Sequence, residues 1–226
     1  MDTINAQILD FLRELRAHND RIWFQANKGR YDMLRLVFIE ETQELINRLS
    51  LFDPEIANLE AKDCIYRIYR DLRFSPDKTP YKCHFAAYIA LGGKSSLRGG
   101  YYLHIEPGGC LLAGGVWCPP PPLLKRLRKD IYDHIEEMEA IMEDPAFKNV
   151  YPGLESEMLK RMPIGFPVDT PYGHVLRHKD FTVVSRKPDA YFTASDWMEH
   201  TVNDFKLLCP FNNFLNYTVD EYLGRI

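Results

Sequence analysis

One stretch of the chain, HFAAYIALGGKSSLRGGYYLHIEPGGCLLAGGVW at residues 84–117, decides the fold. Its apolar and aromatic runs at 84–91, 101–106 and 111–117 each have the length and composition of a β-strand. A glycine-rich loop separates the first two runs, and the Pro-Gly-Gly turn at 107–109 is short enough to close a hairpin between the second and third. Because parallel neighbours need a crossover of a dozen or more residues, these short connections predict antiparallel pairing.

Segments on both sides of this stretch complete the expected fold. The β-branched and aromatic residues at 64–71 and 181–186 bring the expected sheet to about five strands. The order of helical and strand patterns predicts an α+β fold, in which a mainly antiparallel sheet packs with N-terminal, central and C-terminal helices. Helical spacing of apolar residues marks 4–16, 31–49, 123–142, 154–161 and 197–208. We expect a single domain over 1–226, with a helical segment 1–60, a sheet-forming core 61–118 and a helix-strand-helix part 119–226.

Composition and charge exclude several classes of protein. The 226 residues are 46% hydrophobic and 27% charged, which argues against global disorder, collagen-like repeats and channels. The net charge of −4 provides no protein-wide basic field for nucleic acid. The N-terminus lacks the pattern of a secretory signal, and no apolar run approaches the roughly 20 residues of a membrane span. The five cysteines are scattered and odd in number, so we expect free thiols and a cytoplasmic location.

The densest charge lies at 67–82, RIYRDLRFSPDKTPYK, where five cations and two anions leave a local positive excess. Pro76 favours a β-turn and Pro80 keeps Thr79 extended, so a stiff loop displays these side chains. Arginine binds phosphate or carboxylate groups bidentately, and lysine adds a mobile charge. The segment therefore predicts a binding site for a small anionic ligand, formed by Arg67, Arg70, Arg73, Lys78, Tyr81 and Lys82.

Other interpretations of this segment stay open. Arginine and aspartate at strand ends often form ion pairs that only position a loop. In an enzyme acting on a phosphorylated or carboxylated small molecule, the acid–base candidates are Asp71, Asp77 and His84. The alternative function is a non-catalytic module for nucleic acid or a protein partner. Nucleic-acid binding requires a continuous basic stripe between 78–82 and the basic helix start at 125–129.

The charged segment resembles the signature of an uncharacterised bacterial family of conserved hypothetical proteins, the domain of unknown function DUF2461. The family pattern Arg-x-x-Arg-Asp-x-Arg-Phe-Ser-x-Asp-Lys-Thr-Pro-Tyr-Lys matches residues 67–82 throughout. The resemblance covers nearly the whole chain, implies one cytosolic α+β domain and adds weight to the anion site, but the family has no assigned activity to carry over. Further matches are Asn19, Asp20, Trp23, Phe24, Asn27 and Tyr31 upstream, and Gly100-Tyr101-Tyr102 and Arg128 downstream.

The remaining motifs indicate no cofactor. Gly92-Gly93-Lys94-Ser95 lacks the first glycine and the following helix of a phosphate-binding loop, and there is no dinucleotide fingerprint. His174 and His178 have the spacing of two metal ligands on a helix, but Pro171 and Gly173 precede them and no acidic third ligand follows suitably. We therefore expect no cofactor, no metal ion and no membrane partner, and the oligomeric state stays open.

Overall fold

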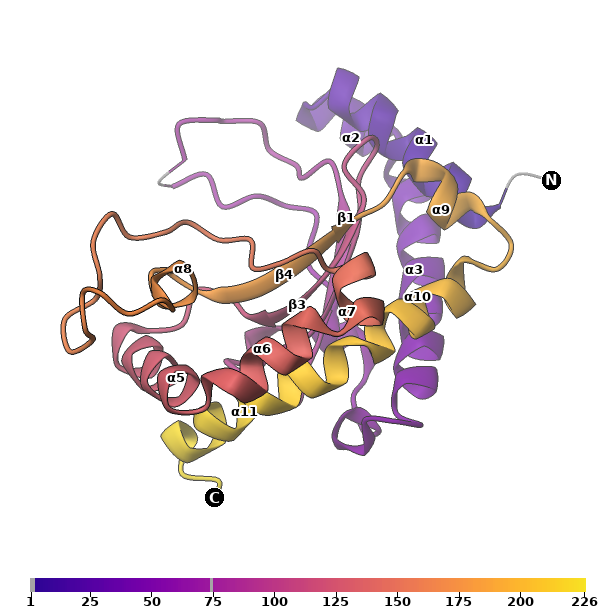
Figure 1. Ribbon diagram of the computed structural model, residues 1–226. Helices are drawn as coiled ribbons and strands as arrows, with labels where there is room; N and C mark the ends of the chain where they lie inside the picture. The colour runs from indigo at the N-terminus through magenta and orange to yellow at the C-terminus, as the bar shows by residue number, and fades with distance from the viewer. Residues whose placement is uncertain (1–2, 74) are drawn as a thin grey trace. The chain divides into compact units, whose positions relative to one another are not determined.

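The computed structural model describes residues 3–73 and 75–226. Met1, Asp2 and Phe74 lie outside the described residues, and Phe74 is one of the residues of the family signature. The fold is α+β and 52% helical, with one antiparallel sheet of four strands in the order β1-β2-β3-β4 (Figure 1). The predicted α+β class and antiparallel sheet are confirmed. The strands are β1 (Phe85–Ile89), β2 (Gly100–Ile105), β3 (Leu111–Val116) and β4 (Phe181–Arg186).

The predicted strand at 64–71 is wrong. Its first residue ends the short helix α4 (Ala61–Cys64). The rest runs as an irregular segment, because Pro80 on the opposing side has no N–H with which to continue a ladder. The segment is tied down by two isolated antiparallel bridges, Ile65 to Ala87 and Tyr69 to Tyr81.

Two helix predictions are also corrected. The central helix is divided into α5 (Pro121–Asp133) and α6 (Ile135–Glu143), with a non-helical backbone at His134 between them. No helix forms at 154–161, because this segment pairs its backbone with another chain segment instead. For example, the Glu155 N–H donates to the Thr182 carbonyl at 2.8 Å. Tertiary pairing here overrides the helical spacing of the apolar residues.

The chain divides into two compact units, each assembled from three separate stretches. The first holds residues up to Lys94 with 102–112 and 186–203, and the second holds 95–101, 113–185 and 204–226. These bounds differ from the three predicted segments, and the single domain stays a prediction.

In the first unit, α1 packs against α3 and α9, and α3 packs against α4 and β1. Side chains at the helix starts explain where the first two helices begin. The Thr3 hydroxyl accepts from the Ala6 N–H at 3.3 Å, and Asp20 accepts from the N–H groups of Ile22 and Trp23. The helical elements are α1 (Ile4–Ala17), α2 (Arg21–Ala26), α3 (Lys28–Leu49), η1 (Pro54–Ile56), α4, η2 (Gly93–Ser95), which continues one residue beyond the unit, and α9 (Asp189–Thr193).

In the second unit, α11 packs against α5 and α6. Asn212 of α11 is buried, donates to the Gly100 carbonyl at 3.1 Å and accepts from the Gly115 N–H at 2.9 Å. Gly115 has a φ of +98°, and a Cβ there would lie 2.0 Å from the Phe181 carbonyl oxygen, so only glycine fits. The remaining helices are α7 (Pro145–Val150), α8 (Gly173–Leu176), α10 (Trp197–Lys206), which crosses the boundary of the units, and α11 (Leu208–Leu223).

Candidate functional site

Three polar side chains follow one face of β2 and its end. Tyr102, His104 and Glu106 alternate with buried apolar residues, and side chains two apart on a strand share a face. The Tyr102 hydroxyl lies 2.8 Å from His104 Nδ1, and His104 Nε2 lies 2.9 Å from Glu106 Oε2. Because an ionised carboxylate only accepts, Nε2 carries the proton and the Tyr102 hydroxyl donates to Nδ1.

His84 joins this row from the neighbouring strand. It directly precedes β1, which pairs with β2, and its ring centroid lies 4.3 Å from that of His104. One donor atom from each of His84, His104 and Glu106 lies within 4.8 Å of the other two. These three residues are called the histidine cluster. His84 is half-buried, and within the described chain its ring nitrogens have no hydrogen-bonding partner.

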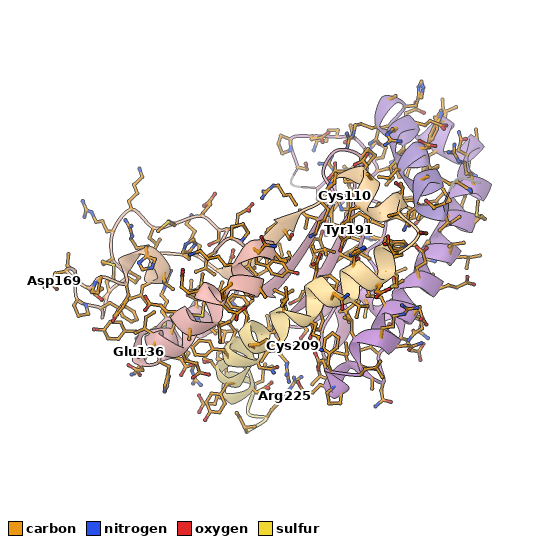
Figure 2. The ribbon with its side chains drawn as sticks, turned by 45° about the vertical axis from the view of Figure 1, so that its right-hand side comes forward. Cys110, Glu136, Asp169, Tyr191, Cys209 and Arg225 are labelled. Carbon is orange, nitrogen blue, oxygen red and sulfur yellow. The ribbon has the colours of Figure 1, made fainter. Side chains whose placement is uncertain are left out.

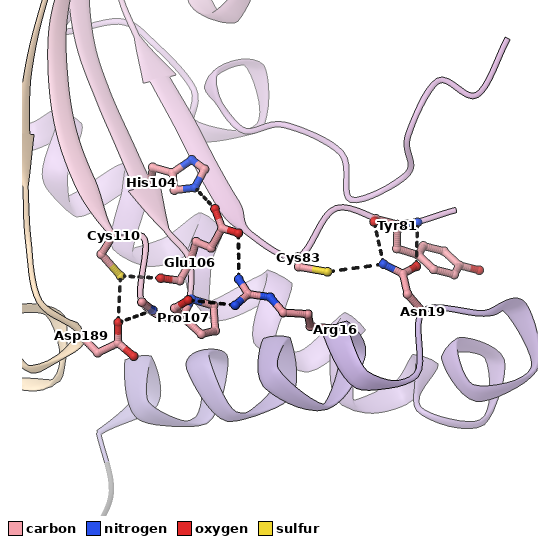
Figure 3. Close-up of polar contacts among 10 residues, drawn as sticks. Arg16, Asn19, Tyr81, Cys83, His104, Glu106, Pro107, Cys110 and Asp189 are labelled. Carbon is pink, nitrogen blue, oxygen red and sulfur yellow. Dashed lines mark hydrogen bonds and ion pairs between the residues drawn. The ribbon is translucent and has the colours of Figure 1, made fainter. Parts of the chain in front are cut away.

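Helix α1 holds the carboxylate of the cluster in place. Arg16, in its last turn, donates to Glu106 Oε1 at 2.8 Å and to the Pro107 carbonyl at 3.1 Å (Figure 3). Asn19, just beyond the helix, donates to the Tyr81 carbonyl at 3.0 Å and accepts from the Tyr81 N–H at 3.1 Å. The same helix end therefore fixes both Glu106 and the end of the charged segment.

Burial favours the neutral form of both imidazoles. Burial, together with the nearby His104 and Lys82, lowers the pKa of His84 to about 4, against the opposing effect of Glu106. Burial also lowers the pKa of His104, against the opposing effect of Glu106. Burial raises the pKa of Tyr102, which therefore stays protonated. A neutral imidazole nitrogen is the form that accepts a proton or binds a metal ion.

Two further cations of the charged segment form no ion pair in the described chain: Lys82, whose charge acts on His84, and the exposed Arg67, whose charge acts on Lys82. Lys82 is half-buried, with its Nζ 5.3 Å from the ring centroid of Tyr66, and the Tyr66 and Tyr102 ring centroids are 6.3 Å apart. Burial and the charge of Arg67 lower the pKa of Lys82. Arg67 and Lys82 are called the unpaired cations.

Arg70 is bonded within the charged segment itself. It forms an ion pair with Asp77 and donates to the Thr79 hydroxyl at 2.6 Å. Asp77 in turn accepts from the Thr79 backbone N–H at 2.9 Å. The Thr79 N–H, the Arg70 guanidinium and the Thr79 hydroxyl lower the pKa of Asp77 to about 2. The bend at 70–79, called the paired loop, is closed by these contacts.

The other two cations of the paired loop also have partners in it. Arg73 donates to both oxygens of Asp71, at 3.0 and 2.7 Å. Hydrogen bonds from the Arg73 side chain and backbone lower the pKa of Asp71 to about 2. Lys78 donates to the Leu72 carbonyl at 3.0 Å. These contacts match the ion-pair interpretation that the sequence left open, while the ligand-binding roles of these residues stay predictions.

Tyr81 packs inward from the end of the segment. Its ring stacks on Phe24 with centroids 3.9 Å apart, and only 6% of the residue is exposed. Of the cations predicted for the anion site, Arg67, Lys78 and Lys82 have no acidic partner in the described chain, and Lys78 donates instead to the Leu72 carbonyl. Of the acid–base candidates, only His84 belongs to the histidine cluster.

The sequence matches the family described as Conserved hypothetical protein (DUF2461) over residues 7–214. The chain belongs to the DUF2461 family. The resemblance seen at residues 67–82 is therefore confirmed, and the family description assigns no activity. No curated protein and no solved structure matches the chain.

The sequence-based analysis of this DUF2461 chain missed Tyr102, His104 and Glu106. The signal that identifies them is the alternation Y-x-H-x-E at 102–106, which places three polar groups on one face of an otherwise apolar strand. That His84 meets this face depends on the pairing of β1 with β2.

The second unit of the DUF2461 chain has a cavity of about 720 Å³. Its lining includes four basic side chains and no acidic one: Lys160, Arg161, His174 and Arg177. Asp169 is exposed and lies at the outer end of the loop that carries this lining (Figure 2). Among the described residues, His174 and His178 belong to no group of three metal-ligating side chains, and their Nδ1 atoms contact the Pro171 carbonyl and the Ser156 hydroxyl.

The basic start of α5 in the DUF2461 chain makes contacts within the second unit. Arg128 is 9% exposed and donates to the His178 carbonyl at 2.7 Å. Lys129 forms an ion pair with Asp133, one helical turn later. The Arg126 guanidinium lies 5.5 Å from the Tyr222 ring centroid. Three of the four cations are thus engaged, which weakens the case for a nucleic-acid surface here.

Proposed function

We propose that the protein binds a small molecule through a phosphate or carboxylate group at Arg67 and Lys82. Lys82 carries this proposal, because it is a half-buried ammonium group with no carboxylate partner in the described chain and with a second cation acting on it. Partly buried charge without a partner costs free energy, and so does like-charge repulsion. A bound anion offsets both costs and gains charge-assisted hydrogen bonds.

This proposal is narrower than the predicted site. Arg70 and Arg73 hold the paired loop in shape through their ion pairs, so their proposed role is to position the segment rather than to reach a ligand. Lys78 is exposed, and its one hydrogen bond in the described chain, to the Leu72 carbonyl, contributes little.

The acid–base candidates differ in their surroundings. Asp71 and Asp77 are held in the ion pairs of the paired loop, whereas His84 has no hydrogen-bonding partner in the described chain.

The test is a titration of inorganic phosphate into the full chain at low ionic strength, followed by calorimetry. We expect Lys82→Met to weaken phosphate binding by roughly tenfold or more, since a hydrogen bond to a charged group contributes about 1.5–3 kcal/mol. Lys78→Met is the matched control, because it removes the same charge from the same segment. It should leave the affinity within about twofold, as expected for an exposed charge.

Two results contradict the proposal. Equal losses in both lysine variants would show that phosphate responds only to net charge. A loss confined to Arg161→Met would instead place the anion site in the basic cavity of the second unit, the alternative that the cavity's lining favours. A steep salt dependence with nucleic acid but no phosphate binding would support the non-catalytic module.

We also propose a cytoplasmic location. All five cysteines are free, as is usual in a reducing compartment. No helix in the described ranges combines the length and the apolar character that a bilayer crossing requires. Fractionation of cells that express the chain tests the location.

A further inference from the structure

We propose that the histidine cluster binds one divalent transition-metal ion, with Zn²⁺ as the probe that best suits its donors. His84, His104 and Glu106 each present one donor atom, and these atoms lie within 4.8 Å of one another. Two imidazole nitrogens and one carboxylate oxygen form a ligand set that zinc and other first-row ions accept. The geometry and the chemistry of the donors carry this proposal.

Two of the three donors already lie close to the spacing of neighbouring ligands. His104 Nε2 and Glu106 Oε2 are 2.9 Å apart. Two ligands at about 2.1 Å from a tetrahedral zinc ion are about 3.4 Å apart, so these two atoms need to separate by only about 0.5 Å. The ion would replace the hydrogen bond between these two atoms. His104 would then carry its proton on Nδ1, and the Tyr102 hydroxyl would turn from donor to acceptor, so the imidazole releases no proton.

The third donor, His84, makes no hydrogen bond through its ring nitrogens in the described chain. The His84 ring is half-buried and lies against that of His104, at 4.3 Å between centroids and with 32° between planes. Donors of one tetrahedral ion at about 2.1 Å are about 3.4 Å apart. The widest separation in the cluster, which is at most 4.8 Å, must therefore close by up to about 1.4 Å, and the His84 ring can turn because no hydrogen bond in the described chain holds its nitrogens.

Contacts outside the three donors support the same function. Metal-binding histidines usually hydrogen-bond through their second nitrogen, and ligating carboxylates are also held by other groups. Tyr102 supplies the first contact, on His104 Nδ1, and Arg16 supplies the second, on Glu106 Oε1 (Figure 3). Three protein ligands leave at least one position open, which is typical of metal sites that take water or a substrate.

This proposed metal site uses none of the residues of the His174/His178 pair, which the sequence argued against as a metal site. The proposal replaces the expectation that the chain binds no metal ion. It does not depend on anion binding at Arg67 and Lys82, because it is carried by different residues.

The experiment measures Zn²⁺ binding by the full chain in a buffer free of phosphate and carboxylate. Equilibrium dialysis followed by metal analysis gives the stoichiometry, and competition with a chelator of known affinity gives the dissociation constant. We expect one Zn²⁺ per chain. Co²⁺ should give the d–d absorption of a site with nitrogen and oxygen ligands and no thiolate charge-transfer band.

Single variants locate the ion. His84→Gln and Glu106→Gln should each weaken Zn²⁺ binding at least as much as loss of an outer contact, which is about 10- to 100-fold. His200→Gln is the matched control, since His200 is exposed, bonds only Asp196 in the described chain, and should bind no ion. Circular dichroism and metal-free urea unfolding confirm that each variant folds. His84→Gln is the safest of them, because it breaks no hydrogen bond in the described chain.

The proposal is wrong if the parent chain binds no Zn²⁺ at micromolar concentration. It is also wrong if folded His84→Gln and Glu106→Gln bind Zn²⁺ as tightly as the parent, or if a thiolate band shows that a cysteine supplies the ligand. Failure of phosphate to bind leaves this result unaffected, because no phosphate is present.

Discussion

The paired loop and the histidine cluster belong to the same unit of the molecule and use their polar groups in opposite ways. In the paired loop, Arg70 and Arg73 face Asp77 and Asp71 and neutralise them close to the surface. In the histidine cluster, three donor atoms converge, and the His84 nitrogens have no hydrogen-bonding partner within the described chain. The charged segment thus pairs most of its own charges, whereas a few polar residues on one strand face form the proposed metal site.

The largest effect that separates the two regions is a difference in pH dependence. In a metal-free buffer with chelator, we expect the free energy of unfolding to fall as the pH drops from about 6.5 towards 4. The pKa of His84 is lowered to about 4 in the folded chain, so protons bind the unfolded chain first. Since each pKa unit corresponds to about 1.4 kcal/mol, this loss is at most about 3 kcal/mol. His104, Glu106 and Lys82 are the titrating groups that act on His84, and His104 titrates in the same direction.

The paired loop should lose its contribution at lower pH. Asp71 and Asp77 have lowered pKa values of about 2, so their stabilisation is present above about 3.8 and is lost as the pH falls through 2. Urea unfolding at pH 7, 5.5, 4.5, 3 and 2 measures the free energy of unfolding across both windows. His84→Gln should flatten the upper window only, and Asp71→Asn with Asp77→Asn the lower window only. Identical curves for the parent and His84→Gln would contradict the burial argument.

Removing one carboxylate from each region should give the next largest difference. Glu106→Ala leaves the buried His104 Nε2 without its acceptor, and a buried polar group without a partner costs about 1–3 kcal/mol. Arg16 keeps its contact with the Pro107 carbonyl. Asp71→Ala frees an arginine, but Arg73 is 77% exposed and is solvated at once. Urea unfolding at pH 7 compares the two variants. Equal destabilisation would mean that the cluster is no better organised than the surface loop.

The smallest expected effect is that of Arg73→Met. Its ion pair with Asp71 is exposed, and exposed pairs contribute little to stability because water and salt screen them. We expect an unfolding midpoint and a phosphate affinity close to those of the parent chain. If Arg73→Met weakened phosphate binding as much as Lys82→Met does, Arg73 would belong to the binding site. The distinction between paired and unpaired cations would then be wrong.

Much of the fold was predictable because local patterns agree with tertiary structure there. The three strands at 84–117 and the strand at 181–186 form where composition and turn signals predict them. The segment at 64–71 has strand composition, but it lies opposite Pro80. The sequence shows where the proline is, but it does not show that this proline lies opposite the segment. The helical spacing at 154–161 fails for the same reason, since backbone pairing with a distant segment is stronger.

The site was less predictable than the fold. The sequence alone determined the family, the α+β class and the positions of the charged groups, because these depend on residue identity, local spacing and turn chemistry. Only the tertiary structure decided which cations are neutralised and which donors meet, because ion pairing and convergence depend on distances between residues far apart in the chain. Glu106 reaches Arg16 of α1, and His84 reaches His104, only after the helix and the neighbouring strand have packed around them.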